Sequence, residues 1–152
     1  RHIRPWIESG GHFVSQYHRP IDNWDKTQSA PLRLQPGSPS IRWRVTDAAA
    51  SVRMLQPDHP LLNSPNRITN EDFDGWVKER GLYFASEWDP AYVPLLAMSD
   101  TDEAPLEGSL LAARIGAGSH VHCALNLFYQ MDHMVVGAFR LFTNLMTPSS
   151  RT

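Results

Sequence analysis

Residues 70–92 run NEDFDGWVKERGLYFASEWDPAY and combine acidic, basic and aromatic side chains more densely than any other part of the chain. Within this stretch Phe73, Trp76 and Val77 are spaced i, i+3 and i+4, which places them on one face of a helix. Acidic side chains lie in the first turn of that helix, where its dipole favours negative charge. The spacing therefore predicts a short amphipathic helix that packs its aromatic face on the rest of the domain.

The ends of this helix are also marked in the sequence. Thr69 or Asn70 is suited to cap its start, and Gly81 is suited to end it. Residues 82–84 (LYF) follow as an apolar anchor. We therefore expect a capped helix from residue 70 to residue 81.

Composition and charge limit the class of protein. Of the 152 residues, 41% are hydrophobic and 20% are charged, as in an ordinary globular domain. The net charge of −2 provides no basic field for nucleic acid or for an anionic membrane surface. No apolar run approaches the roughly 20 residues that a membrane span needs. We expect a single domain over residues 1–152, with neither a nucleic-acid nor a membrane partner.

The amino-terminal part predicts one helix-to-strand step of an α/β fold. Residues 3–7 place three apolar side chains on one helical face, and Gly10 and Gly11 end that helix. Residues 12–17 (HFVSQY) form a short apolar strand. Residues 19–39 contain four prolines and few aliphatic side chains, so we expect a long irregular loop there.

The remaining strands and the last helix follow from local patterns. Residues 40–46 alternate between apolar side chains and arginines, which predicts a half-buried strand. Residues 52–55 are a weaker strand candidate, and residues 93–98 are an apolar run typical of a single buried strand. Two strands flank a glycine-rich turn and predict a β-hairpin, and an apolar stripe predicts a carboxy-terminal helix; these elements cover residues 109–114, 120–127 and 135–146.

Several of these segments together resemble a known module. They are residues 10–18 (GGHFVSQYH), 22–25 (DNWD), 42–47 (RWRVTD), 57–61 (PDHPL), 75–84 (GWVKERGLYF) and 137–142 (GAFRLF). The chain resembles, over nearly its whole length, the carboxy-terminal class I glutamine-amidotransferase-like region of bacterial PIG-L-type (LmbE-like) deacetylases. Residues 75–84 are the most specific part of this resemblance.

The resemblance implies a partial flavodoxin-like α/β fold. We expect a three-layer sandwich with a long irregular insertion and a carboxy-terminal β-hairpin plus helix. This chain would then be the carboxy-terminal half of a larger glutamine-amidotransferase-like domain, with the first strands of the sheet located before residue 1. Because half of a sheet exposes an edge and apolar faces, we expect a homo-oligomer or contacts with an upstream domain.

The chemistry implied by the family does not extend to these residues. The deacetylase zinc motif is of the His-Pro-Asp-Asp kind, whereas residues 57–60 have similar letters in another order. An amidotransferase cysteine lies on an exposed strand-to-helix elbow, but Cys123 lies within a predicted strand, where a small buried side chain is typical. We therefore expect no catalytic residue, no metal site and no cofactor.

A metal site is the alternative for the second hairpin strand. His120 and His122 share one face of that strand, a spacing that suits metal ligation. His18, Asp132 or His133 would supply a third ligand. The competing interpretation is that both histidines face solvent and that Asp132 and His133 form an ordinary loop pair.

A ligand site is predicted beyond the first strand. The candidate residues are His18, Asn23, Trp24 and Asp25, because ligands of open α/β sheets bind beyond the carboxyl ends of strands. An aromatic ring beside amide and carboxylate groups suits a sugar. In the alternative interpretation Trp24 only anchors the loop.

Four charged residues complete the candidate ligand-binding set. Arg42 and Arg44 are suited to bind a carboxylate or phosphate, or to pair with acidic side chains of residues 71–79. Glu79 and Arg80 have the same two interpretations. The leading hypothesis is a non-catalytic accessory or ligand-binding module associated with carbohydrate. The alternatives are a metal-assisted hydrolase that uses His120 and His122, and a purely structural assembly domain.

Overall fold

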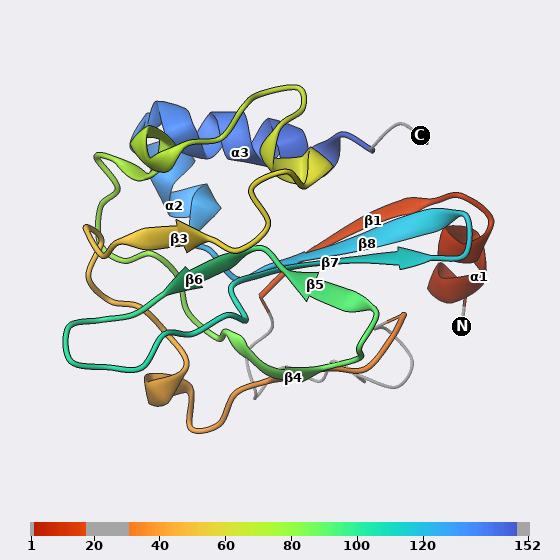
Figure 1. Ribbon diagram of the computed structural model, residues 1–152, viewed down its shortest axis with the longest axis horizontal. Helices are drawn as coiled ribbons and strands as arrows, with labels where there is room; N and C mark the ends of the chain where they lie inside the picture. The colour runs from red at the N-terminus through yellow and green to blue at the C-terminus, as the bar shows by residue number, and fades with distance from the viewer. Residues whose placement is uncertain (1, 18–30, 149–152) are drawn as a thin grey trace.

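A four-stranded mixed sheet organises the chain, and its strands come from both ends of the sequence. The computed structural model of the protein describes residues 2–17 and 31–148. The sheet has the order β1-β8-β7-β5, built from β1 (His12–Gln16), β8 (Gly118–Cys123), β7 (Leu110–Ile115) and β5 (Tyr92–Pro94). β1 runs parallel to β8, and the other neighbours are antiparallel (Figure 1). With its helices, this mixed sheet confirms the predicted α/β class.

The predicted β-hairpin is the centre of this sheet. β7 and β8 pair in register from Leu110 opposite Cys123 to Ile115 opposite Gly118. The two strands are joined by a tight turn in which Gly116 has a positive φ of 60°, a conformation that glycine adopts without strain. β8 ends earlier than predicted, because the chain leaves the sheet after Cys123.

The amino-terminal step also follows the prediction. Helix α1 (Ile3–Glu8) ends before Gly10, which has a φ of 122°. β1 then pairs with β8 so that Phe13 is opposite His120 and Ser15 is opposite His122. This parallel pair brings the first strand beside the last one, and β1 is an edge of the described sheet.

Different elements cover the two faces of the sheet. On one face lie α2 (Leu127–Asp132), α3 (Val136–Met146) and the antiparallel pair of β3 (Val52–Met54) and β6 (Leu96–Met98), together with short 3-10 turns (Figure 1). The other face packs against α1 and the pair of β2 (Leu34–Pro36) and β4 (Ala85–Trp88). Two apolar clusters result, the larger one beneath α2 and α3.

The carboxy-terminal helix agrees with its predicted apolar stripe. Ala138, Leu141 and Leu145 of α3 are at most 1% exposed and face the larger cluster. Among the described residues, no helix combines the length and the apolar character that a bilayer crossing needs. The short helix α2 just before it is not predicted by the sequence patterns, and it begins at Leu127, the last residue of the predicted strand 120–127.

The predicted helix over residues 70–81 is shorter than expected. Only the 3-10 helix η3 (Asn70–Phe73) forms, and Thr69 caps it in a reciprocal capping box with Asp72. The chain cannot continue as a helix because Gly75 and Lys78 have positive φ angles of 74° and 71°. Trp76 is nevertheless buried, so the predicted core role of this side chain is confirmed.

The predicted strand over residues 40–46 is wrong. Residues Ser40–Arg42 form the 3-10 turn η1, in which backbone groups bond to one another instead of to a neighbouring strand. Val45 is buried and forms an isolated bridge with Gly81, and the carbonyl of Trp43 accepts the backbone N–H of Phe84, but Ile41 is 63% exposed. The alternating pattern was therefore not the pattern of a sheet face.

The apolar run of residues 93–98 is two strands rather than one. β5 pairs with β7 in the main sheet, and β6 pairs with β3 in a separate two-stranded sheet. Between them the backbone of Leu95 bonds to both partners, through its N–H to Leu110 and its carbonyl to Leu55. The strand predicted at residues 52–55 is confirmed as β3, whereas β2 and β4 were not predicted.

Candidate functional site

The predicted ligand site beyond β1 cannot be placed. His18, Asn23, Trp24 and Asp25 lie outside the described residues. The described part of this region ends at Tyr17, whose ring contacts that of Tyr83 at a centroid distance of 5.5 Å.

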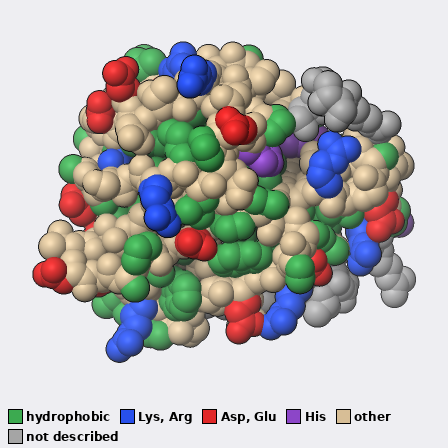
Figure 2. Space-filling view, in the orientation of Figure 1, with side chains coloured by type: hydrophobic (Ala, Val, Ile, Leu, Met, Phe, Trp, Pro, Cys, Tyr) green, Lys and Arg blue, Asp and Glu red, His purple; other side chains and the backbone are tan. Residues whose placement is uncertain are grey.

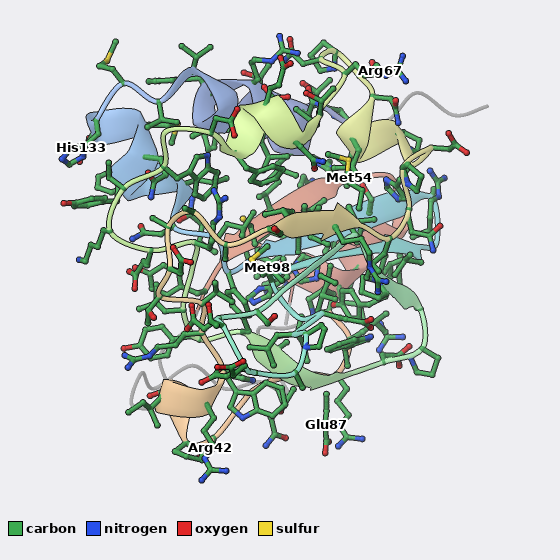
Figure 3. All side chains as sticks on the ribbon, turned by 60° about the vertical axis from the view of Figure 1, so that its left-hand side comes forward. Arg42, Met54, Arg67, Glu87, Met98 and His133 are labelled. Atoms are coloured by element: carbon green, nitrogen blue, oxygen red, sulfur yellow. The ribbon has the colours of Figure 1, made fainter. Side chains whose placement is uncertain are left out.

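The four charged residues of the predicted ligand set do not meet one another. Within the described chain no hydrogen bond or ion pair joins any two of Arg42, Arg44, Glu79 and Arg80. Arg42 is exposed on η1, at the end of the molecule away from His133 (Figure 3). Arg44 lies near Asp100 rather than pairing with residues 71–79, so that predicted pairing is wrong.

Arg80 is buried and serves the fold. Its guanidinium donates to the carbonyl oxygens of Ala50 and Phe73 and lies over the ring of Trp76 at 5.5 Å. Burial lowers its pKa, whereas the charges of Asp47 and Asp74 raise it. Glu79 accepts a hydrogen bond from the side-chain amide of Asn126 at 3.0 Å. These two side chains thus hold neighbouring segments together.

His120 and His122 are buried, which corrects the interpretation that both face solvent. The hydroxyl oxygen of Ser15 lies 2.8 Å from Nε2 of His120 and 2.9 Å from Nδ1 of His122. On its other side the His120 ring is bonded through Nδ1 to the hydroxyl of Tyr92, at 2.7 Å. The histidines are at most 1% exposed and Ser15 is 7% exposed. Parallel pairing of β1 with β8 produces this cluster, because it puts Ser15 opposite His122.

Proton positions in this network follow from Tyr92. Burial and the nearby carboxylate of Asp89 raise the pKa of Tyr92 well above its usual value, so its hydroxyl keeps its proton. If Tyr92 donates to Nδ1 of His120, then Nε2 of His120 donates to Ser15, whose hydroxyl in turn donates to His122. Every one of these bonds then has one donor and one acceptor.

The network has the connectivity of an activated serine but not its accessibility. A serine nucleophile needs an adjacent base and contact with substrate. Here the serine is enclosed between two imidazoles that are themselves buried. We therefore assign this cluster to the packing of β1, β5 and β8.

Metal ligation is not favoured by the described residues. They contain no group of three or more His, Cys, Asp or Glu side chains placed to hold a metal ion. His133, one of the proposed third ligands, is the solvent-exposed residue at the carboxyl end of α2. Its Nδ1 donates to the carbonyl of Tyr129. Cys123 is 2% exposed, and burial raises the pKa of its thiol to about 12, as suits a structural side chain.

A cavity of ≈ 570 Å³ lies between the hairpin and the turn η2 (Pro60–Leu62). Its apolar lining residues are Pro60, Leu61, Ala91, Val93, Ala112, Ala113 and Val121. Its polar lining residues are His12, His59, Arg114, Ser119 and the buried His120. In Figure 2 histidine side chains lie among hydrophobic ones near the middle of the face shown. Size and lining are those of a small-molecule site.

Hydrogen bonds orient the two histidines of the cavity. Nδ1 of His59 accepts the backbone N–H of Leu61 at 3.1 Å, and burial lowers the pKa of His59. The His59 imidazole is therefore neutral at pH 7, with its proton on Nε2. His12 bonds through Nε2 to the carbonyl oxygen of Leu145 at 2.7 Å and through Nδ1 to the hydroxyl of Ser119 at 2.6 Å.

Arg114 and Ser119 enter the cavity from opposite strands of the hairpin. They are direct partners in the β7–β8 register, and His12 on β1 is in turn opposite Ser119 on β8. Neither residue is marked by a sequence motif, because their proximity depends on strand register. The one available signal was the predicted hairpin, which places Arg114 near its turn.

Comparisons with models of protein families, with curated proteins and with solved structures find no match to this chain.

Proposed function

We propose that the chain is a non-catalytic ligand-binding module of a PIG-L-type deacetylase-like protein, and that its ligand is a small carbohydrate. The cavity between the hairpin and η2 carries this proposal, because it combines an apolar wall with a few oriented polar groups. The setting in a deacetylase-like protein rests on the sequence segments that resemble that family, residues 75–84 above all.

The finer fold assignment belongs to the same proposal. We infer that the sheet is the second half of a flavodoxin-like sandwich. The helix α1 leading into β1, and the parallel pairing of β1 with β8, support this inference. The antiparallel hairpin and the β5 edge would then be the carboxy-terminal additions to that sandwich.

The burial of the two candidate nucleophiles, Cys123 and Ser15, favours a binding role over catalysis. Cys123 is enclosed in the core, and the hydroxyl of Ser15 lies between two buried imidazoles. A catalytic thiol or hydroxyl must contact its substrate. The accessible polar groups instead lie in the cavity, where His59 offers an N–H and Ser119 offers an oxygen to a hydroxylated ligand.

Titration of isotope-labelled protein with a panel of neutral and acidic monosaccharides tests the proposal. We expect saturable NMR shifts at the backbone amides of Ala112, Ser119 and Val121. Ala91→Trp should abolish them, because this exposed alanine lines the cavity and a tryptophan there would obstruct it. Ala49→Trp, at an exposed position outside the cavity, is the matched control. Shifts absent for every sugar, or unchanged in Ala91→Trp, would refute binding at this cavity.

A further inference from the structure

We propose that the cavity is specific for a sugar carrying an anionic group, a carboxylate or a phosphate, and that Arg114 binds that group. This inference rests on the proposed function and adds the chemical class of the ligand. It is carried by the charge of Arg114 and by the hydrogen bonds of His12, His59 and Ser119.

Among the described lining residues, Arg114 is the one Lys or Arg side chain. The described lining contains no Asp or Glu side chain. Arg114 itself is exposed and forms no hydrogen bond or ion pair with the part of the chain that the structure describes. By contrast, Arg140 is paired with Asp72 and Arg4 with Glu8. An unpaired guanidinium presents a planar fork of donors that matches a carboxylate or phosphate.

The neighbouring groups suit the hydroxyls of the same ligand. Because the backbone N–H of Leu61 occupies Nδ1 of His59, Nε2 remains as a neutral donor. Nε2 of His12 donates to the carbonyl of Leu145, and its Nδ1 lies 2.6 Å from the hydroxyl oxygen of Ser119. A hydroxyl oxygen has two lone pairs, so Ser119 can still accept from a donor on the ligand. Arg114 thus offers a cationic pair of donors, His59 a neutral donor and Ser119 an acceptor. These three groups are complementary to an anion that also carries hydroxyl groups.

The register of the hairpin explains why these groups serve one ligand. Arg114 and Ser119 are opposite each other at the turn end of β7 and β8, and His12 is opposite Ser119 on β1. Three neighbouring strands thus present three polar side chains in one row across the sheet. A rigid sheet holds them in fixed relative positions, which favours preorganised binding.

Calorimetric titration with D-glucose, D-glucuronate, glucose 6-phosphate and inorganic phosphate at low ionic strength tests this inference. We expect at least one anionic sugar to bind about tenfold or more tightly than glucose, as charge-assisted hydrogen bonds imply. Comparing the affinities for D-glucuronate and glucose 6-phosphate shows whether the site prefers a carboxylate or a phosphate. Arg114→Gln should reduce that affinity to the level of glucose, and Arg114→Lys should retain part of it because the charge remains.

Arg53→Gln is the matched control, since Arg53 is also an exposed strand arginine but lines a separate depression of ≈ 410 Å³. Loss of anion binding in Arg53→Gln rather than in Arg114→Gln would overturn the assignment. Equal affinity for glucose and the anionic sugars would overturn the charge inference and leave carbohydrate binding intact. Binding of inorganic phosphate that depends on Arg114, without binding of any sugar, would support the anion site and refute the sugar. No binding of any probe would refute both proposals. Melting curves of each variant establish that it is folded.

Discussion

At the scale of single residues, Arg80 shows how a charged side chain can replace helical hydrogen bonds. The backbone departs from a helix after Phe73, and the carbonyl oxygen of Phe73 accepts from the guanidinium of Arg80. The same group binds Ala50 and lies against the rings of Phe73 and Trp76. Burying an unpaired charge carries a large desolvation free energy. The hydrogen bonds and ring contacts of the Arg80 guanidinium offset this free energy.

Replacing Trp76 with alanine should destabilise the domain by about 3–5 kcal/mol, as for other large-to-small changes in a core. Trp76 is 6% exposed, and its indole N–H donates to the carbonyl of Asp72 at 2.9 Å. Denaturant unfolding measures the loss. Trp6→Ala is the comparison, because Trp6 is 52% exposed and should cost no more than about 1 kcal/mol. Equal losses for the two variants would contradict the burial of Trp76.

Asp100 should make stability depend on pH. Partial burial raises its pKa, but hydrogen bonds from Thr46 and Asp47 and the charge of Arg44 outweigh that effect, so the pKa lies below its usual value. A carboxyl with a depressed folded-state pKa stabilises the fold above its unfolded pKa, and this contribution disappears as the pH falls through the folded value.

We therefore expect Asp100→Asn to be less stable than the wild type at pH 7, by about 1 kcal/mol. The difference should shrink as the pH falls below about 4, where the wild-type carboxyl takes up a proton. Thermal melts of both proteins across this pH range provide the measurement. Glu103→Gln, an exposed change in the same turn, serves as control. A gap that stays constant with pH would show that the Asp100 charge is unimportant.

At the scale of elements, the packing of α3 on η3 depends on one glycine. A Cβ atom at Gly137 would lie 1.8 Å from the carbonyl oxygen of Asp72. The side chain of Arg140, one turn later, donates to the carboxylate of the same Asp72 at 2.8 Å. Asn144 then bonds through its side chain to the backbone of Leu61 and Asn66. One face of α3 thus holds the irregular segment between β3 and β4.

Gly137→Ala should destabilise the protein although alanine favours helices by about 1 kcal/mol. The new methyl group must displace backbone, and overpacking of this kind costs about 1–3 kcal/mol in net stability. Thr143→Ala, at an exposed position of the same helix, should stay within about 0.5 kcal/mol of the wild type. Urea unfolding of the two variants compares them directly. A stabilised Gly137→Ala would mean that α3 does not pack this closely on η3.

At the scale of the whole molecule, the described surface has a sheet edge and a group of exposed apolar side chains. β1 is an edge strand of the sheet. Apolar side chains of α2, α3 and the segment between them are also exposed, and they are Phe128, Met134, Val136 and Phe139. Such edges and patches mark association surfaces in many proteins.

We expect this chain to form homo-oligomers at micromolar concentration when no other domain covers these surfaces. Light scattering after gel filtration measures the mass. Phe139→Ser should shift the protein towards monomer, because Phe139 and Val136 are exposed on the same side of α3. Ile41→Ser removes an apolar side chain of similar exposure from η1 and should have no such effect. A stable, cooperatively melting wild-type monomer would contradict the prediction that the chain is half of a larger domain.

The sequence by itself determined the elements whose hydrogen bonds and apolar faces are local. The hairpin of β7 and β8, the stripe of α3, the step from α1 to β1 and the cap at Thr69 follow from periodicity and from glycine and threonine chemistry. The turn of the hairpin, the cap and the apolar stripe of α3 depend on neighbours within a few residues, so each pattern is present in a short window. β1 is recognisable from its short apolar run, although its hydrogen bonds go to β8.

Tertiary structure alone decided the rest. The helix expected at residues 70–81 ends at Phe73, because Gly75 and Lys78 take positive φ angles, and Arg80 bonds to the Phe73 carbonyl instead. Residues 40–42 of the expected strand form a turn, whereas Trp43 and Val45 bond to the distant segment 80–84. His120 and His122 are buried because β1 supplies Ser15 beside them. The cavity of His12, His59, Arg114 and Ser119 depends on the register of three strands and on the position of η2. Contacts between segments this far apart in the chain leave no periodic signal, because they are created only when the strands pair.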